Sequence, residues 1–201
     1  MSLTSKFICV LCAVFALCTS CYAIDVSAKS AVIIEASSQK TIYGKEENVR
    51  MPMASTTKIM TAIVAIENCS LEKEVVITKE SVGIEGSSIY LHEGERLTME
   101  QLLYALLLSS ANDAATAIAY EVGGDISSFA DMMNKKAEEL GLENTHFDNP
   151  HGLDSENHYT TASDLAKLAC YAMENPVFYN MVSTYKKTIP LNAGDGTRVL
   201  V

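Results

Sequence analysis

The stretch Pro52-Met53-Ala54-Ser55-Thr56-Thr57-Lys58-Ile59-Met60-Thr61-Ala62 places a serine and a lysine at the start of an apolar helix. Apolar residues recur at helical spacing after the serine, which predicts a helix from about Ser55 to Asn68. These residues are Ile59, Ala62, Ile63 and Ile66. Because Lys58 follows Ser55 by one helical turn, the two side chains share a face and can touch.

The pair Ser55 and Lys58 has the residue types needed for nucleophilic catalysis. A serine hydroxyl is a weak nucleophile until a base takes its proton, and a lysine is such a base when burial or a nearby charge lowers its pKa. Amides at a helix N-terminus can also stabilise developing negative charge. Taken alone, S-x-x-K is a weak pattern, because a helix cap followed by a solvated lysine explains most isolated matches.

A second polar motif, Ser110-Ala111-Asn112, lies between two apolar helices. If this loop is buried, its hydroxyl and its carboxamide both need hydrogen-bonding partners. A simple turn between helices is the alternative, since serine and asparagine favour turns. The two motifs carry more weight together, because an S-x-x-K at a helix start is followed by an S-x-N on a helix–helix loop.

The remaining patterns predict strands near both ends of the chain and helices between them. Strand-like runs lie at 31–36 and 41–43 as a hairpin, at 74–78, at 89–91, from 185 and after a turn at 194–196. Further helices are expected from Thr98, with Gln101 completing a capping box, over 114–122, from about 127 to 141, and from Thr161 to before Pro176. This order predicts a sheet built from both ends of the chain around a helical middle.

Residues 1–23 have the pattern of an export signal. Lys6 precedes an apolar run from Phe7 to Cys18, which is too short to span a bilayer comfortably but suits a signal peptide. A cut after Ala23 leaves small residues at the positions that a signal peptidase accepts. A retained anchor and a lipid-modified Cys21 are the alternatives. Residues 24–201 are then expected to form the folded part.

The composition indicates a globular protein with an acidic surface. The 15 Lys and Arg residues against 25 Asp and Glu residues give a net charge of −10, and 48% of the chain is hydrophobic. This charge argues against sequence-independent nucleic-acid binding, which relies on basic side chains that neutralise phosphates. After the leader only Cys69 and Cys170 remain, and the sequence leaves open whether they form one bridge or stay buried free thiols.

Three parts of the chain resemble the serine-type D-alanyl-D-alanine carboxypeptidases, also called low-molecular-mass penicillin-binding proteins. Residues 52–62 resemble the nucleophile segment of that family, and LLSSANDAA at 107–115 resembles its second motif. FDNPHGLD at 147–154 and HYTTASDLA at 158–166 together resemble its downstream signature. The likeness extends over about residues 28–190. It implies an α/β (α+β) fold of the β-lactamase/transpeptidase-like type, with an antiparallel sheet flanked by helices and a helical subdomain.

The resemblance implies a role for each matching residue. Ser55 would attack the carbonyl between the two terminal D-alanines of a peptidoglycan stem peptide, its N–H would supply half of an oxyanion hole, and Lys58 would accept its proton. Ser110 would relay a proton to the leaving D-alanine, and Asn112 would bind the substrate backbone and position Lys58. β-Lactams would acylate Ser55 as covalent inhibitors. Membership of this family implies that no metal or cofactor is needed. It also implies a location in the bacterial cell envelope, outside the cytoplasm.

The third motif of the family, a K-T-G on a strand that lines the site, does not occur in the sequence. The nearest string is Lys187-Thr188-Ile189, which lies too early and has isoleucine where glycine is needed. We therefore expect a C-terminally truncated domain that lacks sheet strands and the region through which the family associates with membranes. In the family, a main-chain N–H just after K-T-G completes the oxyanion hole, and losing one oxyanion donor can cost about 10²–10³ in rate. The alternative function is therefore an impaired fragment that at most binds cell-wall peptide or a β-lactam.

Two other enzyme classes fit the sequence less well. A class A β-lactamase shares S-x-x-K, but the chain shows no convincing counterpart of the deacylating glutamate. A metal-dependent peptidase would need clustered ligands, and His146, His151 and His158 match no familiar metal-binding spacing. We expect these histidines to be exposed or hydrogen-bonded residues of a loop.

Overall fold

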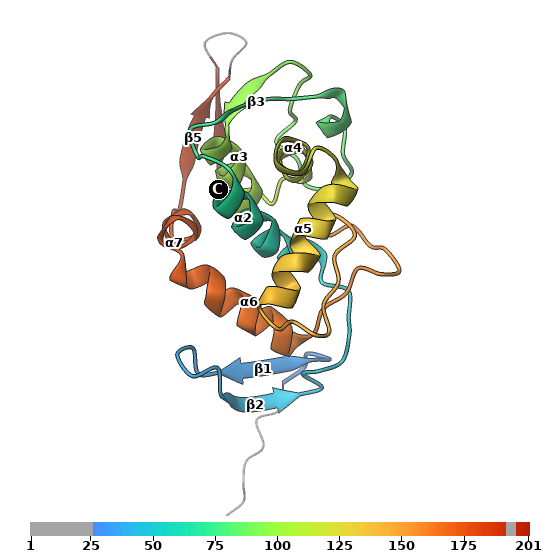
Figure 1. The fold of residues 1–201 in the computed structure, drawn as a ribbon. Coiled ribbons are helices and arrows are strands. Elements are labelled where there is room, and N and C mark those ends of the chain that lie inside the picture. The colour runs from blue at the N-terminus through green and yellow to red at the C-terminus, as the bar shows by residue number, and fades with distance from the viewer. Residues whose placement is uncertain (1–25, 192–195) are drawn as a thin grey trace, which may run out of the picture.

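The computed structural model describes residues 26–191 and 196–201. Within them, helices form the middle of the molecule and short antiparallel strands lie around it (Figure 1). The helices are α2 (Thr57–Asn68), α3 (Met99–Leu108), α4 (Asn112–Gly123), α5 (Ile126–Glu139), α6 (Ala162–Glu174) and α7 (Pro176–Val182), with the 3-10 turns η1 (Ala54–Thr56) and η2 (Lys79–Ser81). The strands are β1 (Ala31–Ile34), β2 (Thr41–Lys45), β3 (Glu74–Val76), β4 (Arg96–Thr98), β5 (Lys187–Pro190) and β6 (Thr197–Leu200). This mixture of helices and antiparallel strands agrees with the expected α+β class.

Helix α2 lies at the centre of the fold and packs against each of the helices α3 to α7 (Figure 1). Its sequence explains this position, because apolar or small side chains face several directions and eight of its residues are buried. In the neighbouring α4, alanines at 114, 115, 117 and 119 are at most 2% exposed. Such small side chains allow two helices to approach closely. The helix that carries Lys58 is therefore held on several sides by the core.

The described strands form three separate antiparallel pairs, β1–β2, β3–β4 and β5–β6. β1 packs against α6, whereas β6 packs against α3, and the first and last pairs lie at opposite ends of the molecule (Figure 1). The prediction of one sheet built from both ends of the chain is therefore wrong for the described residues. Strands share a sheet only where their edges can hydrogen-bond, and here α6 and α7 lie between the two pairs.

Two helix starts follow the capping patterns in the sequence. Thr98 Oγ1 accepts a hydrogen bond from the Gln101 N–H at 3.2 Å, and Gln101 Oε1 accepts one from the Thr98 N–H at 2.9 Å. Thr161 Oγ1 likewise accepts a hydrogen bond from the Asp164 N–H at 3.1 Å. The predicted starts of α3 and α6 are confirmed, as is the hairpin of β1 and β2.

Two local predictions need correction, and one helix was not predicted. Helix α4 begins at Asn112 rather than at residue 114, because the Ala111 carbonyl already accepts the first helical hydrogen bond, from the Ala115 N–H at 3.1 Å. Residues 89–91 form no strand, since Tyr90 has a φ of +58°, far from the extended region. The sequence patterns also miss α7, which begins at Pro176 and is capped by Asn175 Oδ1, an acceptor for the Val177 N–H at 2.9 Å.

The cysteines of the described chain, Cys69 and Cys170, are free and partly exposed. The structure therefore settles the open choice in favour of free thiols, although they are not buried. Residues 1–23, with the predicted signal peptide and Cys21, lie outside the described residues, as does the turn at 194–195.

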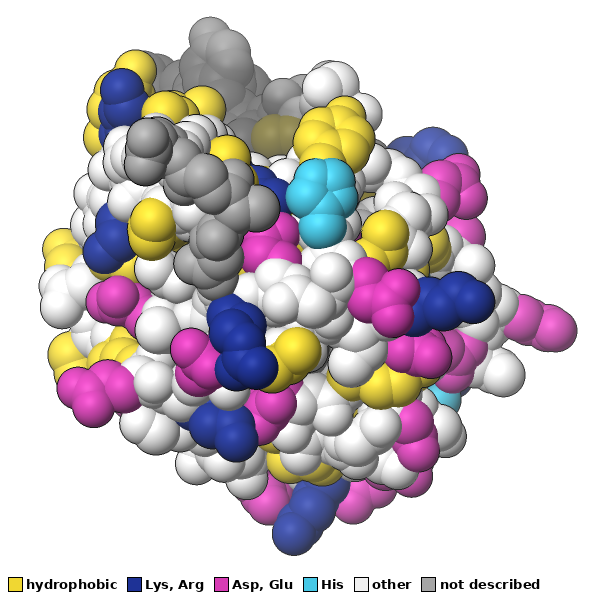
Figure 2. All heavy atoms as spheres, turned by 90° about the horizontal axis from the view of Figure 1, so that it is seen from above, with side chains coloured by type: hydrophobic (Ala, Val, Ile, Leu, Met, Phe, Trp, Pro, Cys, Tyr) yellow, Lys and Arg dark blue, Asp and Glu magenta, His cyan; other side chains and the backbone are white. Residues whose placement is uncertain are grey.

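The surface seen in Figure 2 carries acidic and basic side chains interspersed with one another. Charged side chains of both signs are thus exposed to solvent on this face. Among the helices of the described ranges, none combines the length and the apolar character that crossing a membrane requires.

Candidate active site

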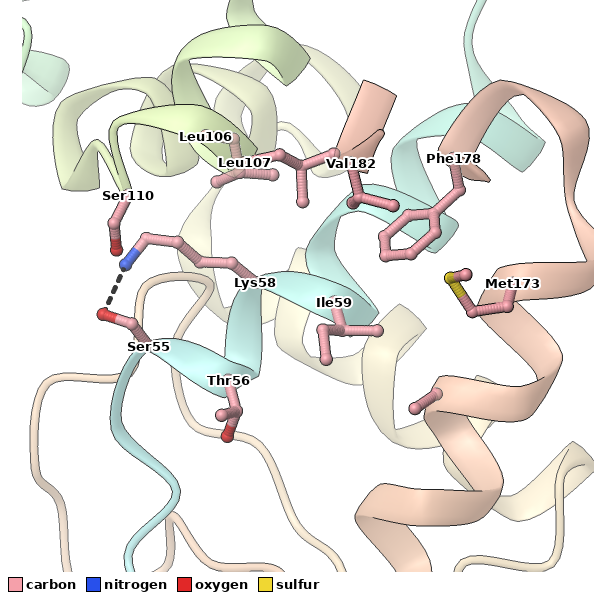
Figure 3. Close-up of a pocket in the computed structure, with 11 residues that line it drawn as sticks. Ser55, Thr56, Lys58, Ile59, Leu106, Leu107, Ser110, Met173, Phe178 and Val182 are labelled. Atoms are coloured by element: carbon pink, nitrogen blue, oxygen red, sulfur yellow. Dashed lines mark hydrogen bonds between the residues drawn. The ribbon is translucent and has the colours of Figure 1, made fainter. Parts of the chain in front are cut away.

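The first motif forms a hydrogen-bonded pair at the start of the central helix. Ser55 lies in η1 and is exposed, whereas Lys58 lies in the first turn of α2 and is only 3% exposed. The Lys58 Nζ donates a hydrogen bond to Ser55 Oγ at 3.1 Å (Figure 3). The predicted contact is confirmed, and it joins a hydroxyl open to solvent with a buried amine.

Two further oxygens surround the Lys58 amine. Asn112 Oδ1 accepts a hydrogen bond from Nζ at 2.7 Å, and the His151 main-chain carbonyl accepts one at 2.8 Å. These acceptors and Ser55 Oγ are neutral, so none of them stabilises the ammonium as a carboxylate would. Burial lowers the pKa of Lys58 from 10.5 to about 8. The neutral amine, the form that can accept a proton, is therefore populated near neutral pH.

Asn112 reaches Lys58 from the first residue of α4, and a neighbouring loop sets its orientation. Its main-chain N–H donates to the Ser87 carbonyl at 2.7 Å, and its Nδ2 donates to the Glu85 carbonyl at 2.6 Å. Gly86 lies between these two acceptors with a φ of +90°, and a Cβ there would be 2.7 Å from Asn112 Nδ2. Because glycine permits this close approach, the amide nitrogen faces the loop and the oxygen faces Lys58.

Asp113 anchors the same loop, a role that no sequence pattern predicted. It is 1% exposed, and its carboxylate accepts hydrogen bonds from Ser88 Oγ at 2.6 Å, the Leu91 N–H at 2.9 Å and the Ile89 N–H at 3.2 Å. The Ala114 N–H donates to it as well, at 2.9 Å. A charged residue inside an apolar stretch beside a motif could have indicated this, since a buried charge needs partners.

Ser110 lies in the turn between α3 and α4 with a φ of +52°. This conformation is uncommon for a residue with a Cβ and persists where the surroundings hold it. Its hydroxyl is directed toward the Lys58 amine (Figure 3). Ser55, Lys58 and Ser110 line one cleft, and Asn112 joins them through its hydrogen bond to Lys58. The structure thus brings together all four site residues predicted from the sequence.

The cleft has a volume of about 470 Å³ and combines a polar end with apolar walls. Ser55, Lys58 and Ser110 form the polar end, where their side chains converge (Figure 3). The apolar lining consists of Ile59, Leu106, Leu107, Ala169, Met173, Phe178 and Val182. A cavity of this size with a few converging polar groups is typical of sites for small ligands.

The three histidines of the downstream loop have different surroundings. His158 is 3% exposed, whereas the side chain of His146 is partly exposed and lies 3.4 Å from the Asp148 carboxylate. Burial, with help from the nearby Lys58, lowers the pKa of His151 from 6.5 to about 4, so its ring is neutral at neutral pH. Across residues 26–191 and 196–201, no group of three or more potential ligand side chains is placed to hold a metal ion.

The string Lys187-Thr188-Ile189 lies in β5 and takes part in packing against α3. Lys187 Nζ is 4.2 Å from the centroid of the Tyr104 ring and 3.8 Å from Glu100 Oε2. Ile189 is 1% exposed and belongs to the core. These contacts explain the string without a role in the site, in agreement with the sequence analysis.

Comparison with known families supplies the decisive observation. A family model described as D-alanyl-D-alanine carboxypeptidase matches residues 18–197. The chain belongs to the D-alanyl-D-alanine carboxypeptidase family. The resemblance inferred from the motifs is confirmed.

Curated relatives within this carboxypeptidase family agree with the match. The chain is 38% identical over 164 residues to the D-alanyl-D-alanine carboxypeptidase DacF of Bacillus subtilis (strain 168), covering 79% of this chain and 42% of that protein. It is 39% identical over 156 residues to a D-alanyl-D-alanine carboxypeptidase of Streptomyces sp. (strain K15), covering 72% of this chain and 54% of that protein. The chain therefore spans about half the length of these relatives.

Solved structures of carboxypeptidases and penicillin-binding proteins share the fold. The D-alanyl-D-alanine carboxypeptidase of Mycobacterium tuberculosis H37Rv superimposes with a TM-score of 0.85 at 32% identity, covering 92% of this chain and 69% of that one. Penicillin binding protein 6B of Escherichia coli superimposes with a TM-score of 0.80 at 28% identity, covering 90% and 60%. The expected penicillin-binding, transpeptidase-like fold class is confirmed.

Proposed function

We propose that this chain carries the nucleophilic centre of a serine D-alanyl-D-alanine carboxypeptidase. The proposed reaction removes the terminal D-alanine from peptidoglycan stem peptides through an acyl-enzyme on Ser55. The observation that carries the proposal is the 3.1 Å hydrogen bond between Ser55 Oγ and a buried amine whose pKa is lowered to about 8. A nucleophile beside a base of depressed pKa is the arrangement that acyl transfer requires.

Acylation follows from the positions of three residues. The neutral Lys58 amine takes the proton of Ser55 Oγ, which attacks the carbonyl carbon between the two D-alanines and forms a tetrahedral oxyanion. The Ser55 N–H contributes one donor to that oxyanion. Ser110, whose hydroxyl is directed toward Lys58, then passes a proton to the leaving nitrogen as the C–N bond breaks, and takes one in turn from the Lys58 ammonium, which becomes the neutral amine again. The products are free D-alanine and an ester on Ser55.

Hydrolysis uses the same groups again, with water as the nucleophile and the Ser55 oxygen as the leaving group. A water molecule gives a proton to neutral Lys58 and attacks the ester carbonyl, and the Ser55 oxygen leaves and recovers that proton from the Lys58 ammonium. Asn112 Oδ1 holds the amine at 2.7 Å during both steps. Its Nδ2 has a second hydrogen besides the one donated to the Glu85 carbonyl, and we assign that hydrogen to the substrate backbone.

The substrate class, inhibitors and location belong to the same proposal. The names of the relatives specify peptides that end in D-Ala-D-Ala, and β-lactams would acylate Ser55 in their place. Residues 1–23 as a cleaved export signal and 24–201 as part of the carboxypeptidase domain would place the site outside the cytoplasm, in the cell envelope.

A fluorescent penicillin and a synthetic peptide ending in D-Ala-D-Ala test this function. We expect covalent label on Ser55, located by mass spectrometry, and release of D-alanine, with both lost in Ser55→Ala. Ser127→Ala removes an exposed hydroxyl from the first turn of α5 and should change neither. Label without release would support the alternative of a fragment that only binds β-lactam or cell-wall peptide. Neither label nor release would overturn the proposal for this chain.

A further inference from the structure

The residue before the proposed nucleophile has a strained backbone. Ala54 has a φ of +46°, in the left-handed region that residues with a Cβ rarely occupy. Such a conformation costs free energy and persists only where neighbouring groups over-determine it. Because Ala54 is joined directly to Ser55, whatever holds the Ala54 peptide also sets the direction of the Ser55 side chain.

Two neighbours hold the Ala54 carbonyl. Thr57 Oγ1 donates a hydrogen bond to it at 2.7 Å. Gly152, with a φ of +91°, lies so close that a Cβ there would be 1.9 Å from the same oxygen. The carbonyl is therefore confined between a hydroxyl from α2 and a glycine from the downstream loop.

The hydroxyl of Thr57 is itself oriented by a buried histidine. His158 Nε2 lies 2.7 Å from Thr57 Oγ1, and Thr57 and His158 are 0% and 3% exposed. The other ring nitrogen, Nδ1, accepts a hydrogen bond from the Asp148 N–H at 3.1 Å. A neutral imidazole with Nδ1 as acceptor has its proton on Nε2, so His158 donates to Thr57, and Thr57 donates to Ala54.

We propose that His158 and Thr57 are positioning residues for the nucleophile: a directional chain of hydrogen bonds from Asp148 through them to the Ala54 carbonyl holds the strained peptide that aims Ser55 at Lys58. The inference deepens the proposed function and rests on Ser55 being acylated. Neither residue reaches the cleft lining, so both act through the backbone of η1.

This series of hydrogen bonds requires a neutral His158. A second ring proton would turn Nδ1 from an acceptor into a donor that faces the donor N–H of Asp148. Burial is the main influence on this ring and lowers its pKa below 6.5; His146 acts in the same direction, while the carboxylates of Asp148 and Asp154 oppose it. The neighbouring His151 is neutral at neutral pH. The series of hydrogen bonds from Asp148 to Ala54 is therefore intact at neutral pH and is broken only in acid.

Thr57→Val and Thr57→Ser separate the hydroxyl from the shape of the side chain. Rates of Ser55 acylation by a fluorescent penicillin should fall about tenfold or more in Thr57→Val and stay within about threefold of the parent in Thr57→Ser, because only serine keeps the donor to Ala54. Equal acylation rates in the parent chain and in Thr57→Val would overturn the proposal. Thermal melting of both variants checks that each is folded.

His158→Gln distinguishes a positioning role of His158 from a merely structural one. Glutamine keeps an uncharged donor for Thr57 but does not titrate. On a plot of log acylation rate against pH, the parent should show a second, steeper decline below pH 6.5, in addition to the decline caused by Lys58, and His158→Gln should lack that second decline whatever its rate at neutral pH. The same second decline in both proteins would contradict the proposal.

A readout that needs no acylation distinguishes the two proposals. Nitrogen-15 chemical shifts of the His158 ring in the unmodified chain should show the tautomer protonated on Nε2 at neutral pH, with Nδ1 hydrogen-bonded. If this tautomer is present while Ser55 is not labelled, the proposed function fails and the hydrogen-bonded chain stands as a structural element. A ring protonated on Nδ1 at neutral pH would overturn the positioning role whatever the labelling shows.

Discussion

The Lys58 amine donates a 2.7 Å hydrogen bond to Asn112 Oδ1 and joins two motifs that are 54 residues apart in the chain. This bond is shorter than the 3.1 Å bond from the same amine to Ser55 Oγ. Asn112 offers a neutral acceptor, so the bond holds the amine in place without the charge stabilisation of a carboxylate. Asn112 thus sets the position of the Lys58 amine, whereas burial sets its proton affinity.

Acylation of Ser55 should become faster as the pH rises through about 8. The pKa of Lys58 is lowered to about 8, and only the neutral amine, which predominates above that pH, can accept the Ser55 proton. Labelling rates with a fluorescent penicillin, measured between about pH 6 and 10, check this dependence. A rate that is constant over this range would show that Lys58 is not the base.

Asn112→Asp should move this dependence to higher pH by about one unit or more. The substitution places a carboxylate beside the Lys58 amine, which stabilises the ammonium and raises the pKa of Lys58. The rate near neutral pH should fall, and the rate at high pH should recover. Asn180→Asp adds the same charge at an exposed position of α7 and should leave the profile unchanged. Identical profiles for both variants would contradict the assigned contact.

Gly152→Ala should destabilise the protein more than a glycine replacement in open space. A Cβ at Gly152 would be 1.9 Å from the Ala54 carbonyl oxygen, so backbone must shift. Gly124→Ala is the matched control, because Gly124 has a similar φ of +84° and no heavy atom within 4 Å of the added Cβ. The control should cost about 1–2 kcal/mol through its backbone conformation alone, and Gly152→Ala should exceed it by about 2 kcal/mol or more.

Urea unfolding of the two glycine variants provides the measurement. The variant at 152 should also acylate more slowly than the control, since its clash falls on the peptide that precedes Ser55. Equal unfolding free energies for the two variants would mean that the loop moves away from Ala54 at little cost.

Asp113→Asn should lower the free energy of unfolding by about 2–4 kcal/mol. The buried carboxylate accepts hydrogen bonds from one hydroxyl and three main-chain N–H groups. In Asp113→Asn an NH₂ group, itself a donor, replaces one carboxylate oxygen and therefore faces these donors without an acceptor between them. Thermal or urea denaturation checks the loss. Asp131→Asn removes an exposed carboxylate from α5 and should change stability by less than about 0.5 kcal/mol. A loss no larger than that of the control would show that Asp113 does not hold the loop.

Local patterns predicted the parts of the fold that depend on neighbours within one or two helical turns. The capping box of Thr98 and Gln101 marks the start of α3, and the spacing of Ser55 and Lys58 predicts their contact. The same local rules fail for 89–91, where an apolar composition suggests extended chain but Tyr90 turns into the left-handed region. There the carboxylate of Asp113 binds the main chain on both sides of Tyr90, at residues 89 and 91.

The site was predictable as a set of residues but not as an arrangement. Family resemblance pointed to Ser55, Lys58, Ser110 and Asn112, and the structure places them together. The sequence held no comparable indication for the Glu85 carbonyl, which orients the Asn112 side chain. This carbonyl belongs to the main chain of Glu85, so the identity of the residue at that position matters little. The prediction of a single sheet failed for a related reason. Strand-forming residues predict that a segment is extended, but they do not predict which other strand it pairs with.

By itself, the sequence determined the family, the helix that begins at the S-x-x-K motif and the residue types available for acyl transfer, because these depend on chemistry and spacing along the chain. Only the tertiary structure decided that Lys58 is buried among neutral oxygens, and that His158 is aimed at Thr57, 101 residues away. Burial and hydrogen-bond direction arise when distant segments pack against one another. The proton affinity of the amine and the strained backbone before Ser55 are therefore properties of the fold.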